Sequence, residues 1–526
     1  MGTKNLHQLE CLPEEQCCSL FQKIVFEECN VAGNVRASLE KTGREIVGKC
    51  KGLPLAVKAM AGLLRGNEDV NIWKRILKNE IWEAEKGTAQ TEKPLVLPAL
   101  KLSYDHLPSH LKQCFAYCYI FPKAYVFDKI ELVKVWKAQS FVQSSGQDTI
   151  DEVGGDYFDE LLMRSFFQVF KIDDKKRYRM HDLIHELAQS VSSPYCCQVK
   201  ANEPCHVSDR SRHVALLRNN AEQAALEVIG KSKKLRTFLF PGEHLKSFGQ
   251  ALDKIFHSMK YMRLLDLSSS TMLELPESVK EMKLLRYLYL SQTEIRKLPK
   301  SICSLYHLQT LKLLGCLWLF ELPKDLGNLT NLQHLELDEM FWYKSSTLPP
   351  RMGSLTNLQN LHVFHIGPES GYGIDELKGM IYLKGTLRIS KLEHAVNAEA
   401  AKLKEKEGLE KVVFEWSDTD GRPRDEAADE GVLEDLQPHS NLKELQIFHY
   451  KGTRFPSWIR DGLLQNIGTI SISHCTRCKI LSLGEMPRLG NLYIKGMQNL
   501  EEWPEVQYPS LHKLKISSCP KLKELP

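Results

Sequence analysis

The chain contains 526 residues, which is enough for more than one domain. Its content of 43% hydrophobic and 26% charged residues is that of an ordinary globular protein. A net charge of +4 is too small for this length to indicate binding to nucleic acid or to a membrane surface, and no apolar run approaches the roughly 18 residues of a membrane span.

Residues 1–90 have no internal repeat and are predicted to be mostly helical. Helix-forming composition predicts helices over Glu40–Lys49 and Leu53–Arg65. The sequence Gly-Leu-Pro-Leu-Ala, which begins at Gly52, joins the two. Gly52 suits a turn, and Pro54 suits the first turn of a helix because its missing N–H group has no partner there. On local structure alone, this segment is the start of a helix.

Residues 91–200 predict a second helical domain that carries a small β-hairpin. We expect helices over Leu97–Leu107, Lys129–Gln139, Asp151–Ser165 and Asp182–Val191. Two short strands, FFQVF from residue 166 and RYRMH from residue 177, are separated by the polar turn sequence DDKK. Helices followed by a hairpin indicate a winged-helix domain. Winged helices often bind DNA, but no helix here is clearly basic, which argues against that role.

From Met262 onward the sequence repeats the pattern apolar-x-x-apolar-x-apolar. The central leucines stand 23, 23, 24 and 26 residues apart, at Leu265, Leu288, Leu311, Leu335 and Leu361. A period of this size indicates a solenoid, because each unit is too small to bury its own apolar face. Side chains of a strand alternate, so Leu288 and Leu290 should enter the core while Tyr289 faces solvent.

Leucine-proline pairs follow most of the early strands, at Leu275, Leu298, Leu322 and Leu348. Proline stops strand pairing, so each pair marks a turn toward the outer side of a leucine-rich repeat. The alternative, amphipathic helices with leucine heptads, conflicts with prolines at the repeat period. Looser units extend the array over residues 205–526, to 12 or 13 repeats. An acidic insertion at residues 417–435 is expected to be a solvated loop, and an acidic contact for a partner is the other possibility.

Fifteen cysteines in a chain of this length are not a disulfide framework. Several of them stand just after predicted strands, which fits buried thiols in a reducing cytoplasm. Cys475 and Cys478 form a lone C-x-x-C pair with no second pair and no histidines at ligand spacing, so the sequence does not indicate a zinc site.

Four segments resemble, in order, the motifs of plant nucleotide-binding leucine-rich-repeat disease resistance proteins of the coiled-coil class. Residues 7–26 are similar to the RNBS-C segment, 52–56 to GLPL, 114–127 to RNBS-D, and 180–182 to MHD. The resemblance covers most of residues 1–190, and the repeats fit the rest. It implies an α+β multidomain fold: a helical ARC1 portion at 1–90, a winged-helix ARC2 domain at 91–200, and a leucine-rich-repeat horseshoe at 205–526.

The resemblance also implies an ADP site. In the family the GLPL proline lies against the base and the MHD histidine approaches the β-phosphate. The corresponding residues here are Gly52, Leu53, Pro54, Leu55, Met180, His181 and Asp182. Asp182 is expected to be the N-cap of the following helix. His181 and His185 have the spacing of zinc ligands, but the residue after His181 is aspartate rather than the glutamate of zinc proteases and no third ligand is evident, so no metal is predicted.

The chain departs from the family in three respects. It contains no phosphate-binding G-x-x-x-x-G-K-[ST] loop, no acidic strand for Mg²⁺ and no coiled coil. We therefore expect an N-terminally truncated receptor with little nucleotide affinity and no NTP hydrolysis, hence no enzyme. A smaller departure is Ser140, where the family usually has glycine.

These observations favour a non-catalytic immune receptor whose repeats bind a pathogen effector, a guarded host protein or the nucleotide-binding region. The expected binding surface consists of the outward strand residues Arg286, Tyr287, Tyr289, Gln309, Lys312, His334, Glu336, Asn360 and His362. Two alternatives stay open. One is an NTPase switch, if a phosphate loop lies upstream, and the other is a scaffold such as a ubiquitin-ligase substrate receptor, which would need neither GLPL nor MHD.

Overall fold

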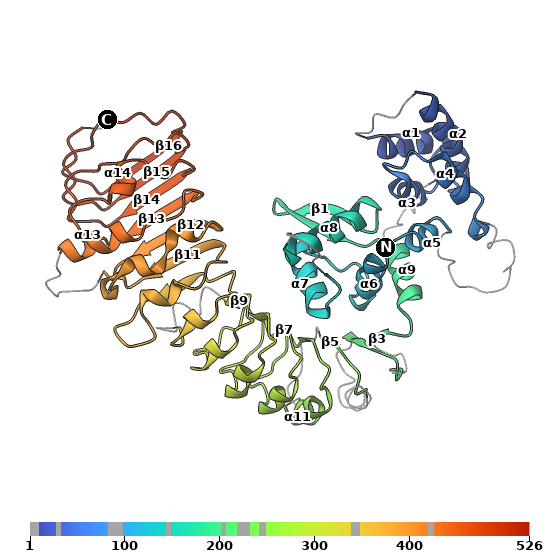
Figure 1. Cartoon of the computed structure of the whole chain (residues 1–526), viewed down its shortest axis with the longest axis horizontal. Helices are drawn as coiled ribbons and strands as arrows, with labels where there is room; N and C mark the ends of the chain where they lie inside the picture. Colours follow the sequence, from blue (N-terminus) through green and yellow to red (C-terminus); the bar gives the residue numbers. More distant parts are fainter. Residues whose placement is uncertain are drawn as a thin grey trace, which may run out of the picture. The chain divides into compact units, whose positions relative to one another are not determined.

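The computed structural model describes residues 10–27, 33–82, 98–143, 149–200, 207–217, 232–240, 249–337, 348–418 and 426–524. The predicted ends of the ARC1 and winged-helix domains near residue 90, the first residues of the RNBS-C segment, Leu97 and part of the acidic insertion lie outside these ranges. The chain divides into two compact units, Met1–Leu217 with Leu235–Leu239, and Arg218–Lys234 with Phe240–Pro526. Figure 1 shows the elements of both in sequence colours.

The first unit begins with helices that pack around one tryptophan. They are α1 (Glu14–Val25), α2 (Gly33–Lys49), α3 (Pro54–Leu64) and α4 (Val70–Leu77). Trp73 is fully buried, with the Phe21 ring edge-on at 5.8 Å and the Phe26 ring stacked at 6.4 Å. The predicted helices at Glu40–Lys49 and Leu53–Arg65 are confirmed, and the first extends back to Gly33.

Five further helices and a hairpin form the winged-helix part of the same unit. The helices are α5 (Pro98–Asp105), α6 (Ser109–Tyr117), α7 (Lys129–Gln139), α8 (Ile150–Met163) and α9 (Asp182–Ser192), and the hairpin strands are β1 (Gln168–Ile172) and β2 (Lys175–Arg179). The hairpin turn is shorter than DDKK, because only Asp173 and Asp174 have the left-handed φ of a two-residue turn. Lys175 and Lys176 therefore belong to the strand.

Ser140 closes α7 in the left-handed conformation, with φ of 63°. This conformation clashes with a Cβ atom, which explains why glycine suits the position. We predict that Ser140→Gly raises the free energy of unfolding by about 0.5 to 1 kcal/mol. Chemical unfolding of the full chain measures the change, and Ser140→Ala, which keeps the Cβ atom, should bring no gain. An equal effect of both substitutions would contradict the backbone explanation.

The first repeat strands belong to the first unit. They are β3 (Cys196–Lys200), β4 (His213–Leu217) and β5 (Thr237–Leu239), and β4 pairs in parallel with both others. Buried polar contacts tie them to α6: Thr237 Oγ1 lies 3.2 Å from Tyr117 Oη and 3.0 Å from His213 Nδ1. The parallel ladder thus starts at Cys196, before the predicted boundary at residue 205, and β3 is a repeat strand that the sequence analysis did not predict.

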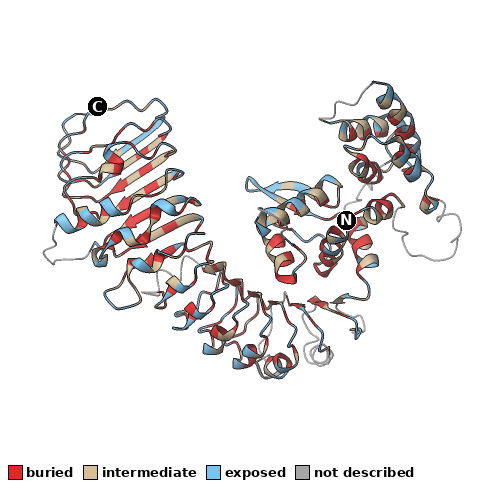
Figure 2. Ribbon diagram, viewed as in Figure 1, coloured by how far each residue is buried: buried red, intermediate tan, exposed pale blue. Residues whose placement is uncertain are grey.

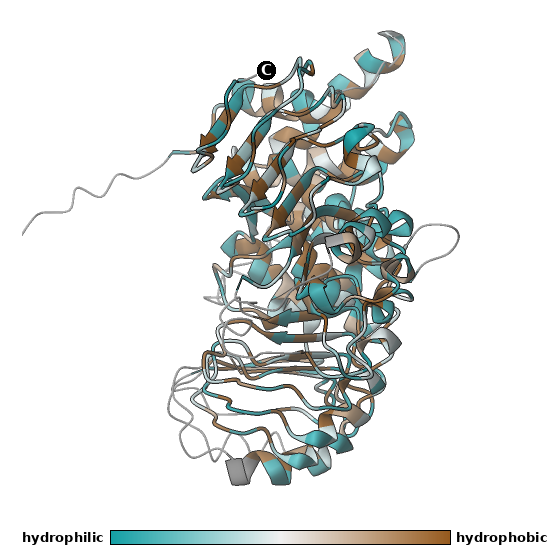
Figure 3. Ribbon diagram, turned by 90° about the vertical axis from the view of Figure 1, so that its left-hand side faces the viewer, coloured by the Kyte–Doolittle hydropathy of each residue, from teal (hydrophilic) through white to brown (hydrophobic). Residues whose placement is uncertain are grey.

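The second unit is a solenoid of parallel strands. One run contains β6 (Leu264–Asp266), β7 (Tyr287–Tyr289), β8 (Thr310–Leu313) and β9 (His334–Leu337). A seven-stranded sheet follows, with strands β10 (Val363–His365), β11 (Gly385–Ser390), β12 (Leu409–Glu415), β13 (Glu444–Phe448), β14 (Thr469–Ser473), β15 (Asn491–Lys495) and β16 (Lys513–Ser517). Hydrophobic and hydrophilic residues follow one another along these strands (Figure 3), and the predicted inward side chains, such as Leu288 and Leu290, are fully buried.

The leucine-proline pairs mark turns into short helices. Pro276 and Pro299 are the N-caps of the 3-10 helices at Glu277–Glu281 and Lys300–Ser304, with φ near −65° as the proline ring requires. The turn prediction is confirmed at these two repeats.

The acidic insertion is not simply a solvated loop, because its second half is helix α13 (Glu426–Asp435). Its acids hold the next repeat in place. Glu430 accepts hydrogen bonds from Thr453 and from the Arg454 backbone, and Glu434 accepts them from Ser457 at the start of α14 (Ser457–Arg460). Although burial acts to raise it, the pKa of Glu430 is lowered overall by the hydrogen bonds from Thr453 and Arg454.

Candidate functional site

The GLPL segment forms the entry to α3. Leu53 is the N-cap in extended conformation, and Pro54 occupies the first turn with its ring exposed. Gly52 has φ of +72°, and a Cβ atom there would lie 2.8 Å from both Cys11 Cβ and the Leu12 carbonyl oxygen. The Leu12 N–H group also donates to the Gly52 carbonyl at 2.9 Å. Only glycine fits this close approach, so Gly52 is required by the backbone.

The MHD segment forms the entry to α9, and it corrects one prediction. The N-cap of α9 is His181, whose Nδ1 accepts a hydrogen bond from the Leu183 N–H group at 3.2 Å, and Asp182 is the first helical residue. Nδ1 therefore carries no proton in this arrangement, and the neutral ring bears its proton on Nε2. Met180 is buried, while His181 is exposed, so the Nε2–H group can donate to an external acceptor.

His185 has a separate structural role, one turn along α9. Its side chain is buried and its Nε2 lies 2.8 Å from the Phe121 carbonyl oxygen, which also accepts from Gln198 Nε2 at 2.8 Å. Burial lowers the pKa of His185, and nearby Lys123 and Lys200 add to this effect. His181 points to solvent and His185 into the core, so the pair does not form a metal site. No cluster of three or more ligand residues occurs in the described ranges.

The structure places the two nucleotide-binding motifs in one unit but does not connect them directly. Both α3 and α9 pack against α5. Among the residues that the structure describes, no hydrogen bond joins Gly52–Leu55 to Met180–Asp182. They supply two separate, exposed contact points.

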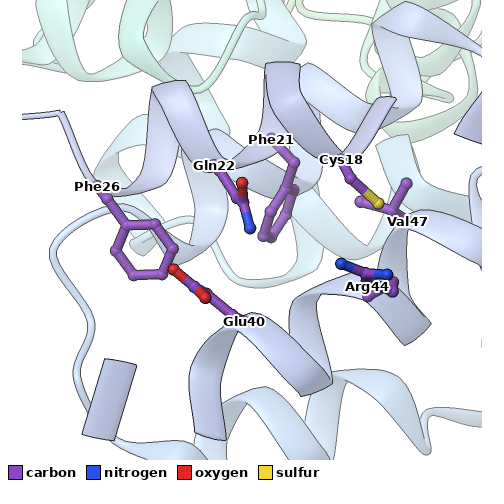
Figure 4. A pocket seen from close by; sticks show the side chains of 7 residues that line it. All are labelled: Cys18, Phe21, Gln22, Phe26, Glu40, Arg44 and Val47. Carbon is purple, nitrogen blue, oxygen red and sulfur yellow. The ribbon is translucent and has the colours of Figure 1, made fainter. Parts of the chain in front are cut away.

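A cleft in the first unit lies away from these motifs. Figure 4 shows side chains of α1 and α2 around it. Its lining residues are Cys18, Phe21, Gln22, Phe26, Glu40, Arg44 and Val47. None of the seven predicted nucleotide-contacting residues belongs to this set, so the cleft is not the ADP site that the motifs imply.

The outward side chains of β6–β9 form one row in strict register, which we call the polar row: Asp266, Tyr289, Lys312 and Glu336. Lys312 Nζ lies 3.1 Å from Glu336 Oε2 and 5.3 Å from the centre of the Tyr289 ring. Burial raises the pKa of Asp266 to about 6, against the lowering effect of the Ser268 hydrogen bonds and of Lys312. The sequence analysis missed Asp266, although it stands at the repeat position of Tyr289.

The structure corrects part of the predicted binding surface. Tyr287 and Lys312 are only 4% and 8% exposed, because neighbouring side chains of the same face cover them. Arg286, Tyr289, Gln309, His334 and Glu336 are half-buried, and His362 is exposed. Two of the predicted residues are thus almost completely covered, while these six keep part of their surface accessible to solvent.

Asn360 makes a structural contact that the sequence analysis did not predict. Its side chain accepts from the Leu335 N–H group at 3.2 Å and donates to the Leu335 carbonyl at 3.1 Å. The Asn360 side-chain amide thus pairs with both backbone groups of Leu335, as a neighbouring strand would do. Asn360 and His362 precede β10, so neither belongs to a strand.

The later sheet carries its own charged contacts on the corresponding face. Arg388 lies 3.5 Å from Glu415 and 6.0 Å from the centre of the Phe448 ring, and Lys411 lies 2.8 Å from Glu444. The sequence analysis did not predict these residues as part of the binding surface, because the strands of the later repeats begin at irregular spacings.

The geometry defines a winged-helix domain joined to a leucine-rich-repeat solenoid, and comparison with known proteins agrees. Residues 120–188 match the winged-helix domain of disease resistance proteins, and residues 374–497 match the R13L1/DRL21 leucine-rich repeats. The chain is 36% identical over 560 residues to disease resistance RPP13-like protein 1 of Arabidopsis thaliana, covering 100% of this chain and 51% of that protein. It is 35% identical over 552 residues to disease resistance protein RGA2 of Solanum bulbocastanum, covering 100% of this chain and 52% of that protein.

The chain belongs to the family of plant disease resistance proteins. It spans about half the length of the relatives it matches. Among the described helices, none is both long enough and apolar enough to cross a bilayer.

Proposed function

We propose that this chain serves plant innate immunity as a non-catalytic sensor whose repeats bind a pathogen effector or a guarded host protein. The observation that carries the proposal is the partly accessible pair Tyr289 and Glu336 of the polar row, flanked by the half-buried Arg286 and Gln309. Tyrosine and arginine on a rigid sheet are the residues that most often anchor protein interfaces. The repeats could also contact a nucleotide-binding region. We place the protein in the cytoplasm, where thiols such as the buried Cys475 and Cys478 stay reduced.

Proximity labelling in leaf tissue tests the binding face. The test variant carries Arg286→Ala, Tyr289→Ala and His362→Ala, which keep the Lys312–Glu336 ion pair intact. The matched control carries Lys280→Ala, Lys300→Ala and Asp325→Ala, three exposed residues in or next to the 3-10 helices of the same repeats. We expect the first variant to lose at least one labelled protein that the wild type and the control retain. Identical labelled sets for all three chains would refute the proposed face.

The residues present could contact ADP only at two separate, exposed points of the first unit, Pro54 and His181. Pro54 can face a base and the His181 Nε2–H group can donate to a phosphate, but the sequence has no glycine-rich loop to surround the phosphates. We therefore propose that nucleotide binding by this chain is weak and that it does not hydrolyse NTP.

Thermal unfolding with and without ADP checks this second proposal. A ligand at 100 times its Kd would stabilise the protein by roughly 2.7 kcal/mol, which is a clear rise in Tm. We expect no such rise at millimolar ADP, and the same Tm for His181→Ala with and without ADP. A rise in the Tm of the wild type that His181→Ala abolishes would contradict the proposal, because Pro54 and His181 would then bind ADP without a glycine-rich loop.

A further inference from the structure

The winged-helix hairpin is a two-stranded sheet, and a single β-bridge joins its second strand to the segment before α7. Phe127 and Tyr178 exchange backbone hydrogen bonds of 2.7 and 3.0 Å, so the segment before α7 pairs with β2 on the side opposite to β1. Phe127 and Tyr178 are buried. Because side chains alternate along a strand, their neighbours point away from the core.

We call this outward side the wing face. It consists of Val126, Phe170, Ile172, Lys175, Arg177 and Arg179. Figure 2 shows the hairpin, labelled β1 in Figure 1, as mostly exposed or half-buried.

Positive charge is concentrated on this hairpin. Residues 168–179 contain five cations and two acids, while the whole 526-residue chain has a net charge of only +4. Arg177 pairs with Asp128 at 2.8 Å, and Arg179 lies 5.5 Å from the centre of the Phe170 ring. Lys171, Lys175 and Lys176 are exposed, and in the described part of the chain they make no ion pair. The small net charge of the chain thus conceals a local basic surface.

Aliphatic side chains lie exposed among these cations. Val126 is 44% and Ile172 45% exposed on the wing face itself, and Val169 is 54% exposed on β1. Ile130 at the start of α7, three residues after the bridge residue Phe127, is 67% exposed. Apolar side chains that gather on a basic surface indicate an interaction site.

We propose that the wing face attaches the protein to an anionic phospholipid surface, a role beyond the sensing proposed above. Cations interact with lipid phosphates while short aliphatic side chains enter the headgroup region. Nucleic acid fits less well, because binding of single strands relies on free aromatic rings and the Phe170 ring already has Arg179 over it. The turn acids Asp173 and Asp174 lie next to the face and oppose its attraction to anions.

Cosedimentation of the full chain with phosphatidylcholine vesicles, with and without phosphatidylserine, tests the proposal. We expect binding only with phosphatidylserine, and a decrease as salt is added. Lys175→Glu with Arg179→Glu should weaken the binding roughly tenfold or more. Lys300→Glu with Lys404→Glu, the same charge change at exposed sites on the repeats, should leave it nearly unchanged.

Two further variants separate the electrostatic contribution to vesicle binding from the contribution of the aliphatic side chains. Asp173→Asn with Asp174→Asn should strengthen the binding, and Ile172→Ser should weaken it without changing its salt dependence. The circular dichroism spectrum of each variant should match that of the wild type. Equal weakening by the hairpin and the repeat variants would overturn the proposal. So would equal binding to uncharged vesicles, or stronger binding to double-stranded DNA or polyglutamate than to phosphatidylserine vesicles.

Discussion

Replacing Gly62 with valine is expected to lower the free energy of unfolding of the first unit by about 3 kcal/mol. Gly62 is the point where α3 crosses the end of α8. A Cβ atom there would lie 2.6 Å from the Met163 carbonyl oxygen and 2.8 Å from Arg164 Cα. These are backbone atoms, so no side-chain rotation can relieve the clash, and the two helices must move apart. Because α3 begins at Pro54, the same change should displace the GLPL segment.

Gly48 provides the matched control for Gly62. It lies in α2, and a Cβ atom there would meet nothing within 4 Å. Gly48→Ala should therefore stabilise the protein by about 0.5 to 1 kcal/mol through better helix propensity. Urea unfolding followed by tryptophan fluorescence, with Trp73 in the same unit, measures both variants. If Gly62→Val is as stable as wild type, the close crossing of α3 and α8 is incorrect.

The second large effect is a rise in stability at alkaline pH that depends on Lys406. This side chain is fully buried, and its Nζ donates to the carbonyl oxygens of Leu377 at 2.8 Å and Met380 at 3.1 Å. Burial lowers the pKa of Lys406 from 10.5 to about 8, an effect that nearby Glu405 opposes. The folded state therefore binds this proton more weakly than the unfolded chain does.

The sign of the effect follows from that difference in proton affinity. Below pH 8 the lysine is charged in both states and its burial costs the folded state about 3 kcal/mol. This cost disappears as the pH rises from about 8 to 10.5, because the folded protein loses the proton first. We expect the unfolding free energy of the wild type, minus that of Lys406→Met, to rise by about 3 kcal/mol across this window.

Subtracting the Lys406→Met curve removes the effects of tyrosine and cysteine ionisation, which both proteins share. Lys404→Met, at an exposed position of the same segment, should show no pH-dependent difference from the wild type. A constant difference between wild type and Lys406→Met over pH 8 to 10.5 would mean that Nζ remains solvated.

Periodic features of the chain were predictable from its sequence. The leucines of the repeats recur at a nearly fixed interval, and the central leucine of each early repeat is buried as expected, because side chains alternate along a strand and these leucines all lie on its inner face. The helix at Lys129–Gln139 was predicted with its observed bounds, and in the structure Asp128 caps its start. Local chemistry was sufficient in these places.

Features that depend on neighbours distant in the sequence were not predictable. Asp182 looked like the better N-cap, but the backbone leaving β2 places His181 there. Asn360 looked like a surface residue, but the gap between β9 and β10 leaves the Leu335 backbone in need of its amide. Tyr287 and Lys312 alternate correctly along their strands, yet side chains from adjacent repeats cover them.

The class of the protein can be read from the chain alone, because repeat period, proline placement and ordered motifs are all local properties of the sequence. Which outward residues remain accessible, which strands belong to which unit, and where charge gathers depend on how distant segments pack together. Thr237 joins the winged helix to the first repeat strands through Tyr117, a residue far away in the sequence. The wing face likewise includes Val126 because Phe127 pairs with Tyr178, a residue about fifty positions away in the sequence. Burial and electrostatics depend on such distances in space.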